Sequence, residues 1–351
     1  MALVGKRVLK VAGLIVTAIV ALAAAGAGGW AWYTTTYHSR LVRSLEKAGY
    51  QEHRVSVDHV KLNVGVSEPR DGSPIVLIHG QASGWRQYGY ALRDLSKDRQ
   101  VYAIDVPGHG KSDRLESYRA VEVADVLSRY IETIGQPVVL SGHSSGGQLA
   151  ALIAARHPEL VSFLVLEDPP LFATELPEAR NTWNYQDLAV STHEFLSSGE
   201  TDWQAYQWRS QKMWQYFGDS AQGFIGEGLA YHSRHPGAPI DLWTMPPEMN
   251  EAQVYIMDYD PAFGDAFFTG LWNEGFDQEA TLAAIQAPVT YIHCQARYDG
   301  EVLQAAASDE DAARAMDSLP AGAVKVEADS GHNFHVEKRK EFVEILLAGV
   351  G

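Results

Sequence analysis

The chain has 351 residues, 46% of them hydrophobic and 21% charged, which is enough for one large folded core or a core with an insertion. Its formal net charge of −16 opposes binding to the phosphate backbone of a nucleic acid, so we expect no nucleic-acid partner. The single cysteine, Cys294, excludes an internal disulfide framework and any metal site built from several cysteines.

Residues 1–37 predict an N-terminal membrane anchor or a signal segment. An uncharged apolar stretch from Val11 to Trp32 follows three basic residues, and as a helix it would be about 33 Å long at roughly 1.5 Å per residue. Basic residues before such a helix favour a cytoplasmic N-terminus. The predicted localisation is therefore a single-pass membrane anchor with an extracytoplasmic catalytic domain. The alternative is a secreted protein, because Ala25-Gly26-Ala27 has the small residues of a signal-peptide cleavage site.

From about residue 51 the sequence alternates between short apolar runs and helical patterns, which predicts an α/β fold with a mostly parallel sheet flanked by helices. The expected strands are a pair within Arg54–Val66 and the runs Ile75–Ile78, Val101–Ile104, Pro137–Leu140, Val161–Leu166, Val289–Ile292 and Ala323–Val326; the expected helices include Val121–Ile134, Gly146–Arg156 and Val336–Leu347.

The strand rhythm stops between residues 171 and 287, in a segment that is rich in aromatic residues. It holds six tryptophans, namely Trp183, Trp203, Trp208, Trp214, Trp243 and Trp272. We interpret this segment as a helical cap inserted into a core that consists of residues 38–170 and 288–351. Most of these rings are expected in the interior of the cap, and the others in a pocket for an apolar group.

A nucleophile is indicated by Gly142-His143-Ser144-Ser145-Gly146, a G-x-S-x-G pattern that follows an expected strand and precedes an expected helix. A serine hydroxyl is a weak nucleophile that needs a base, and the base in turn needs an orienting carboxylate. His332 follows the last expected strand and is the candidate base. Asp299, which follows the strand before it, is the favoured acid, and Asp168, at the end of Val161–Leu166, is the alternative.

Four sequence blocks together resemble the α/β-hydrolase family, from about residue 52 to the C-terminus. They are Leu77–Gly80, Asp105–Ser112, Gly142–Gly146 and Ser330–His332. The resemblance implies an α/β-hydrolase fold in which Ser144 is the nucleophile, His332 the general base and Asp299 the residue that orients it. It also implies an oxyanion hole made by the backbone N–H groups of Gln81 and Ser145.

Two further residues, Trp85 and His143, are expected to line the substrate pocket, because Trp85 follows the Gly80 block and His143 precedes the nucleophile. Scattered acidic residues such as Asp258 and Asp260 lack a paired histidine at ligand spacing, so we expect no metal, and the chemistry needs no organic cofactor.

The predicted function is a serine hydrolase that cleaves a small-molecule carboxylic ester, or a related acyl compound, of apolar or aromatic character through an acyl-enzyme. The alternatives on the same triad are a C–C bond hydrolase, an acyltransferase or a perhydrolase. A non-catalytic ligand-binding protein of the same fold is the alternative from another class.

Overall fold

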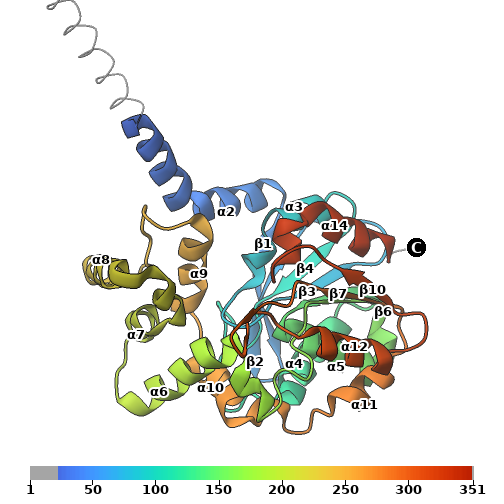
Figure 1. The fold of residues 1–351 in the computed structure, drawn as a ribbon. Helices are drawn as coiled ribbons and strands as arrows, with labels where there is room; N and C mark the ends of the chain where they lie inside the picture. Colours follow the sequence, from blue (N-terminus) through green and yellow to red (C-terminus); the bar gives the residue numbers. More distant parts are fainter. Residues whose placement is uncertain (1–22, 350–351) are drawn as a thin grey trace, which may run out of the picture.

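The protein is described by a computed structural model that covers residues 23–349 (Figure 1). An eight-stranded sheet has the order β1-β2-β4-β3-β5-β6-β7-β10, and a separate two-stranded ribbon is made of β8 and β9. The strands are β1 (Gln51–Val57), β2 (Val60–Val66), β3 (Ile75–Ile78), β4 (Val101–Ile104), β5 (Val138–His143), β6 (Val161–Glu167), β7 (Val289–His293), β8 (Tyr298–Asp299), β9 (Val302–Leu303) and β10 (Val324–Glu327).

The sheet is parallel from β4 to β10, whereas β1 and β2 form an antiparallel hairpin and β2 also pairs antiparallel with β4. Its centre, β3, has no exposed side chain, which explains its continuous apolar sequence. The carboxyl ends of the parallel strands share one edge, and this edge carries the residues that follow β3, β5 and β6. The predicted mostly parallel α/β sheet is confirmed.

Helices cover both faces of the sheet (Figure 1). They are α2 (Tyr37–Lys47), α3 (Gly89–Leu95), α4 (Ala120–Glu132), α5 (Ser145–Arg156), α6 (Val190–Ser198), α7 (Trp203–Ser210), α8 (Ala221–Arg234), α9 (Pro247–Met257), α10 (Pro261–Thr269), α11 (Gln278–Ala283), α12 (Asp309–Ser318), α13 (Phe334–Glu337) and α14 (Arg339–Ala348). The expected last helix, Val336–Leu347, is thus divided between α13 and α14.

The alternation of side chains along β3 divides the interior into two apolar layers. Ile75 and Leu77 pack with residues of α2, α3 and α14, whereas Val76 and Ile78 pack with residues of α4 and α5. Because successive side chains of a strand point to opposite faces, one short strand supplies both layers. The sheet edge that carries the site is therefore held from both sides.

The segment between β6 and β7 contains helices joined by irregular stretches and no strand, from short turns near Glu178 to α11. Trp208 and Trp214 pack with Ile240, Leu242 and Met245 in a separate small core. Of the six tryptophans in the segment 171–287, Trp203, Trp208, Trp214 and Trp272 are buried, whereas Trp243 is 50% exposed. The exact division at residues 171 and 287 stays a prediction, since α11 also contacts α5 of the core.

The N-terminal region differs from its prediction. Residues 23–35 form a helix that turns at Thr36 into α2, and α2 packs on the core through Leu41 and Leu45 (Figure 1). Among the described residues, no helix has both the length and the apolar character that a membrane crossing requires.

The prediction of a membrane-spanning anchor with an extracytoplasmic catalytic domain is therefore wrong for the described residues. At the end of the expected span, the chain joins the folded protein instead of continuing in an apolar helix: Thr34 is only 2% exposed, and the Arg40 guanidinium lies 4.8 Å from the ring centre of the exposed Trp32. Thr34, which follows the apolar run, is therefore buried in the folded protein. The rest of the expected span, up to residue 22, lies outside the described residues.

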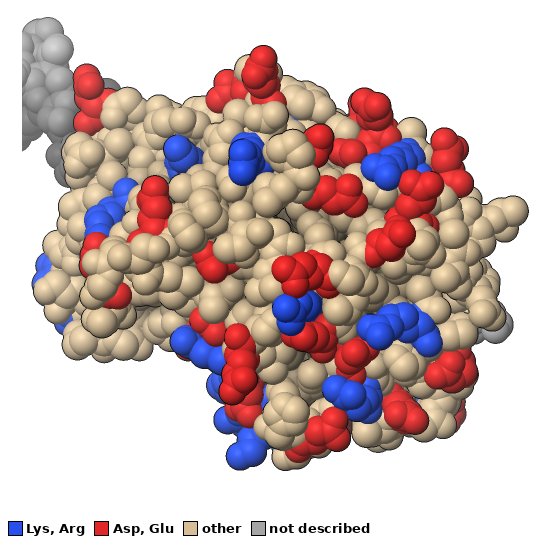
Figure 2. All heavy atoms as spheres, turned by 90° about the horizontal axis from the view of Figure 1, so that it is seen from below, with Lys and Arg blue, Asp and Glu red and all other residues tan. Residues whose placement is uncertain are grey.

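The protein surface is acidic in keeping with the net charge of −16. On the face shown in Figure 2, acidic side chains are more numerous than basic ones, and the two are interspersed among uncharged residues. Many charges of the protein are paired, as in the Arg119–Glu274 and Arg156–Asp125 ion pairs.

Candidate active site

Ser144 occupies a tight turn between β5 and α5. Its backbone has a φ of 56°, a region that a residue with a side chain seldom adopts and that costs about 1–3 kcal/mol. The turn is possible because Gly142 and Gly146 carry no side chain, which lets neighbouring backbone atoms approach them closely. A Cβ atom on Gly146 would lie 2.3 Å from the carbonyl oxygen of Ile78, and one on Gly142 would lie 2.1 Å from the carbonyl oxygen of Gly146. The G-x-S-x-G spacing is thus imposed by packing.

His332 contacts the carboxylate of Asp168. Its Nδ1 lies 2.6 Å from Oδ2 of Asp168, whose side chain is 1% exposed. An ionised carboxylate only accepts hydrogen bonds, so Nδ1 carries the hydrogen and Nε2 of the neutral ring is free to accept a proton. The other oxygen of Asp168, Oδ1, accepts a hydrogen bond of 3.1 Å from the backbone N–H of Cys294, at the end of β7. Asp168 is therefore fixed by two neighbouring segments.

Asp299 does not contact His332 in this structure. It lies on the exposed ribbon strand β8, and its Oδ2 accepts a hydrogen bond of 2.9 Å from the Tyr216 hydroxyl. The expected placement fails because the chain after β7 turns outward into the β8–β9 ribbon and carries Asp299 away from the sheet edge. The loop that holds His332 reaches instead to the end of β6, where Asp168 follows Glu167. Asp168, the alternative acid named from the sequence, is therefore the carboxylate that contacts His332.

The electrostatics of the pair favour a charged imidazole. Burial lowers the pKa of His332, but the hydrogen bond and charge of Asp168, with a smaller contribution from Glu167, outweigh it, so the pKa is raised above its ordinary value. A base with a raised pKa binds the proton of a nucleophile more readily, and it becomes inactive in that role at low pH.

The backbone N–H groups of Gln81 and Ser145 are available to a ligand, since neither donates a hydrogen bond within the described residues. Two buried histidines hold the residues on either side of Gln81. His79 Nδ1 lies 2.8 Å from the Gly80 carbonyl oxygen, and His109 Nε2 accepts a hydrogen bond of 3.1 Å from the Ala82 N–H. The residues on both sides of Gln81 are thus held by histidines, while the N–H group of Gln81 itself is unused.

Gly80 explains how this loop approaches the nucleophile. A Cβ atom on Gly80 would lie 2.8 Å from the Cβ atom of Ser144, which is closer than two such atoms are found. The Gln81 side chain is held on both sides by the helical segment, through Tyr259 at 2.8 Å and Asn184 at 3.0 Å. The side chain of Gln81 is therefore held by Tyr259 and Asn184, while its backbone N–H group stays available to a ligand.

Two cavities meet at the catalytic candidates, because Ser144 and His332 line both. The first has a volume of about 300 Å³ and extends toward Leu41 of α2 and Tyr255 of α9. The second, of about 200 Å³, extends past Ser145 toward Trp183 and Phe267. Both contain more apolar than polar surface.

The two expected pocket residues have different positions. His143 lines the first cavity, although its side chain is only 3% exposed. Trp85 lines neither cavity. It is 3% exposed, stacks on Tyr50 with ring centres 5.9 Å apart, and donates a hydrogen bond of 2.9 Å to Glu52. Its expected place in the pocket is thus corrected to the interior between α2 and the β1–β2 hairpin, because the turn after Gly84 directs the ring inward.

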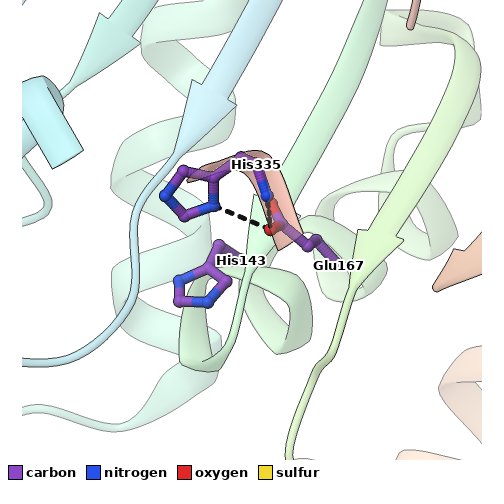
Figure 3. A group of neighbouring side chains, drawn as sticks. All are labelled: His143, Glu167 and His335. Atoms are coloured by element: carbon purple, nitrogen blue, oxygen red, sulfur yellow. Dashed lines mark hydrogen bonds and ion pairs between the residues drawn. The ribbon is translucent and has the colours of Figure 1, made fainter. Parts of the chain in front are cut away.

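His143, the residue before the nucleophile, belongs to a buried cluster with Glu167 and His335 (Figure 3). Oε1 of Glu167 accepts hydrogen bonds from the backbone N–H of His335 at 2.8 Å and from its Nδ1 at 2.7 Å. The three residues also have the donor types of a metal site, with their ligand atoms within 4.8 Å of one another. Most of these donors already serve in hydrogen bonds, so an ion would have to displace them. Sequence reasoning did not find the cluster, although Glu167 directly precedes Asp168 and His335 follows His332 by three residues.

A strained serine between a strand and a helix, beside an imidazole–carboxylate pair at the same sheet edge, is the arrangement of an α/β-hydrolase. Residues 75–345 match the Alpha/beta hydrolase family, and the chain belongs to that family. The resemblance drawn from the sequence blocks is thereby confirmed.

Relatives within the family include proteins that act on acyl compounds. The chain is 35% identical over 105 residues to the 1-acylglycerol-3-phosphate O-acyltransferase ABHD5 of Rattus norvegicus, covering 28% of this chain and 29% of that protein. It is 35% identical over 127 residues to the (Lyso)-N-acylphosphatidylethanolamine lipase of Mus musculus, covering 33% of this chain and 37% of the relative. The chain therefore spans less than two fifths of the length of either relative.

The whole fold is found in solved structures. A crystal structure described as a membrane phospholipase A, a novel bacterial virulence factor, aligns with 96% of this chain and 98% of its own, with a TM-score of 0.59 and 24% identity. At this identity the likeness shows the fold alone.

Proposed function

We propose that this protein is a serine hydrolase that cleaves a carboxylic ester with two sizeable apolar arms. The observation that carries the proposal is the meeting of two cavities at Ser144 and His332, with the Asp168 carboxylate 2.6 Å from the imidazole. Ser144 is the nucleophile, His332 the general base and Asp168 the residue that orients it. Asp168 thus replaces Asp299 in the proposed triad.

The reaction begins when Oγ of Ser144 attacks the ester carbonyl and its proton passes to Nε2 of His332. The N–H groups of Gln81 and Ser145 donate hydrogen bonds to the oxyanion, and one such donor is typically worth about 3 kcal/mol of the barrier. His332 then gives the proton to the departing alcohol, which leaves Ser144 acylated. Water, deprotonated by His332, releases the acid and restores the enzyme.

The two cavities suggest how an ester is accommodated. One arm, acyl or alcohol, lies toward Leu41 and Tyr255, and the other lies toward Trp183 and Phe267. Because both cavities are mainly apolar, burial of hydrocarbon arms supplies binding free energy of about 25 cal/mol per Å². Acyl chemistry is also named for both relatives described above, a lipase and an acyltransferase.

The test uses the full chain and the variant Ser144→Ala. The wild-type protein is expected to hydrolyse p-nitrophenyl esters and to be labelled by a fluorophosphonate, whereas Ser144→Ala is expected to lose both, with kcat reduced by about 10⁶-fold. Undiminished turnover by the variant would exclude Ser144 as the nucleophile. Absence of labelling and turnover in folded wild-type protein would favour a ligand-binding role instead.

A panel of esters then tests the two-armed substrate. Esters with medium-length hydrocarbon on both sides of the carbonyl are expected to have a higher kcat/KM than acetyl esters or methyl esters of equal total carbon number. Equal values for the three classes would refute the assignment of the two cavities to the two arms. A C–C bond substrate, hydrogen peroxide and an alcohol acceptor, tested alongside, distinguish the other chemistries of the same triad.

A further inference from the structure

We infer that Glu167, His335 and His143 form a buried positioning network that holds the His332 loop against the nucleophile turn. The inference rests on the proposed function and assigns residues that the reaction itself does not use. The three side chains are 0%, 1% and 3% exposed, respectively, and they lie close together (Figure 3). Glu167 and His143 directly precede Asp168 and Ser144 in the chain.

The first half of the network fixes the loop from the side of β6. Glu167 ends β6 and precedes Asp168, and its Oε1 accepts both the backbone N–H and the Nδ1–H of His335. His335 lies in α13, only three residues after His332. The start of α13 is thereby anchored to the same strand end that presents the carboxylate to His332.

The second half fixes the loop from the side of β5. His143 ends β5 and precedes Ser144, and its Nε2 lies 3.0 Å from the backbone carbonyl oxygen of His332. A carbonyl oxygen only accepts, so Nε2 donates, and Nδ1 accepts a hydrogen bond of 3.0 Å from Nε2 of Gln87. Burial lowers the pKa of His143 well below its ordinary value, with smaller contributions from His332 and His335, which keeps this neutral tautomer.

The rings also pack on one another. The ring centre of His143 lies 4.4 Å from that of His332 and 5.0 Å from that of His335. The base therefore contacts the network at its carbonyl oxygen and at one ring face, while Asp168 holds its Nδ1. A shift of the loop by even about 1 Å would misalign the base and the nucleophile, and such a displacement can cost about 10²-fold in rate.

The network also places a second negative charge near the base. Glu167 is one of the groups that raise the pKa of His332, although Asp168 contributes more. Oε2 of Glu167 is buried with no hydrogen-bond partner among the described residues, so its charge is poorly screened. Removal of this charge is expected to lower the pKa of His332 without removing a contact of its ring.

The first experiment compares two variants of His335. Asn can place an N–H group where Nδ1 lies, whereas Leu has a similar volume and no donor. We expect His335→Leu to lower kcat for the best ester by about 10²-fold with KM nearly unchanged, and His335→Asn to retain most of kcat. Equal kcat values for the two folded variants would overturn the inference, because they would show that the hydrogen bond to Glu167 does not position the base.

The second experiment removes the charge and keeps the shape. In Glu167→Gln, the amide oxygen still accepts from His335, and an NMR titration of the His332 ring signals is expected to show a lower pKa. The matched control is Glu159→Gln, which alters an exposed glutamate paired with His157 at 3.7 Å before the start of the same strand. The control is expected to leave the pKa unchanged. Equal His332 pKa values in Glu167→Gln and the control would overturn the inference.

The two experiments separate this inference from the proposed function. The NMR titration needs no turnover, so it decides the role of Glu167 even if the wild-type protein hydrolyses no ester. It also decides the matter if His335→Leu does not fold. Activity that is lost on dialysis against a chelator and restored by Zn²⁺ would instead assign the cluster to a metal ion and overturn the positioning role.

Discussion

The substitution Asp168→Asn tests the proposed acid, and the structure allows its effect to be worked out. Oδ1 of Asp168 accepts from the N–H of Cys294, and Oδ2 accepts from Nδ1 of His332. An asparagine must keep its oxygen toward Cys294 to satisfy that buried N–H group, so its NH₂ group faces His332. Asn also tolerates the φ of 44° at this position, which leaves the backbone unstrained by the change.

An NH₂ group facing His332 reverses the tautomer of the imidazole. Nδ1 would then accept a hydrogen bond, and the ring hydrogen would move to Nε2, where the proton of Ser144 must be received. The equivalent change in a well-characterised serine protease lowers kcat by about 10⁴-fold, which we expect here too. That factor corresponds to about 5 kcal/mol in the activation free energy.

The assay measures kcat and KM for the best p-nitrophenyl ester across a pH series, with Asp299→Asn as the matched control. Asp299 is exposed and contacts Tyr216, so the control is expected to keep kcat within about twofold, as is usual for a surface change. The wild-type activity falls as the pH drops through the raised pKa of His332, since the base is then protonated. Near-normal kcat in Asp168→Asn, together with a large loss in Asp299→Asn, would refute this reasoning and restore Asp299 as the acid.

Two further predictions concern stability. Gly146→Ala places a methyl group 2.3 Å from the Ile78 carbonyl oxygen and should lower the free energy of unfolding by about 1–3 kcal/mol. The control Gly226→Ala lies in α8, where space is open, and should raise the free energy of unfolding by up to about 1 kcal/mol. Urea unfolding measures both, and equal changes in the free energy of unfolding would contradict the packing argument. Burial alone would raise the pKa of Glu52, but hydrogen bonds, chiefly from Lys111, lower it from 4.5 to about 2. Glu52→Gln should therefore cost up to about 3 kcal/mol at pH 7, a loss that disappears as the pH falls from about 4.5 to about 2. A difference in unfolding free energy that is independent of pH would show that the charge does not stabilise the fold.

The sequence by itself determined the features that depend on local chain geometry. A run of apolar residues such as Ile75–Ile78 has few conformations that bury every side chain, so the strand was predicted at its observed bounds. The nucleophile turn was equally local, because only glycine fits at positions 142 and 146 beside Ser144. The family likewise followed from short blocks, each of which lies at the end of a strand.

The tertiary structure decided every feature that depends on which segments meet. Asp168 and Asp299 both follow strands, and only the path of the His332 loop past β7 to the end of β6 chooses between them. Trp85 is near the site in sequence, but the turn after Gly84 directs its ring into the core. The apolar N-terminal residues suggested a membrane span, yet no described helix can cross a membrane.

The buried Glu167–His335 pair depends on tertiary structure in the same way. The two residues are separated by more than 160 positions in the chain, and neither carries a local pattern that indicates a partner. Hydrogen bonds and charge pairs between distant residues act over a few ångströms in space, whereas sequence patterns record only neighbours along the chain. The nucleophile was therefore readable from the sequence, but the carboxylates around its base were fixed by the fold.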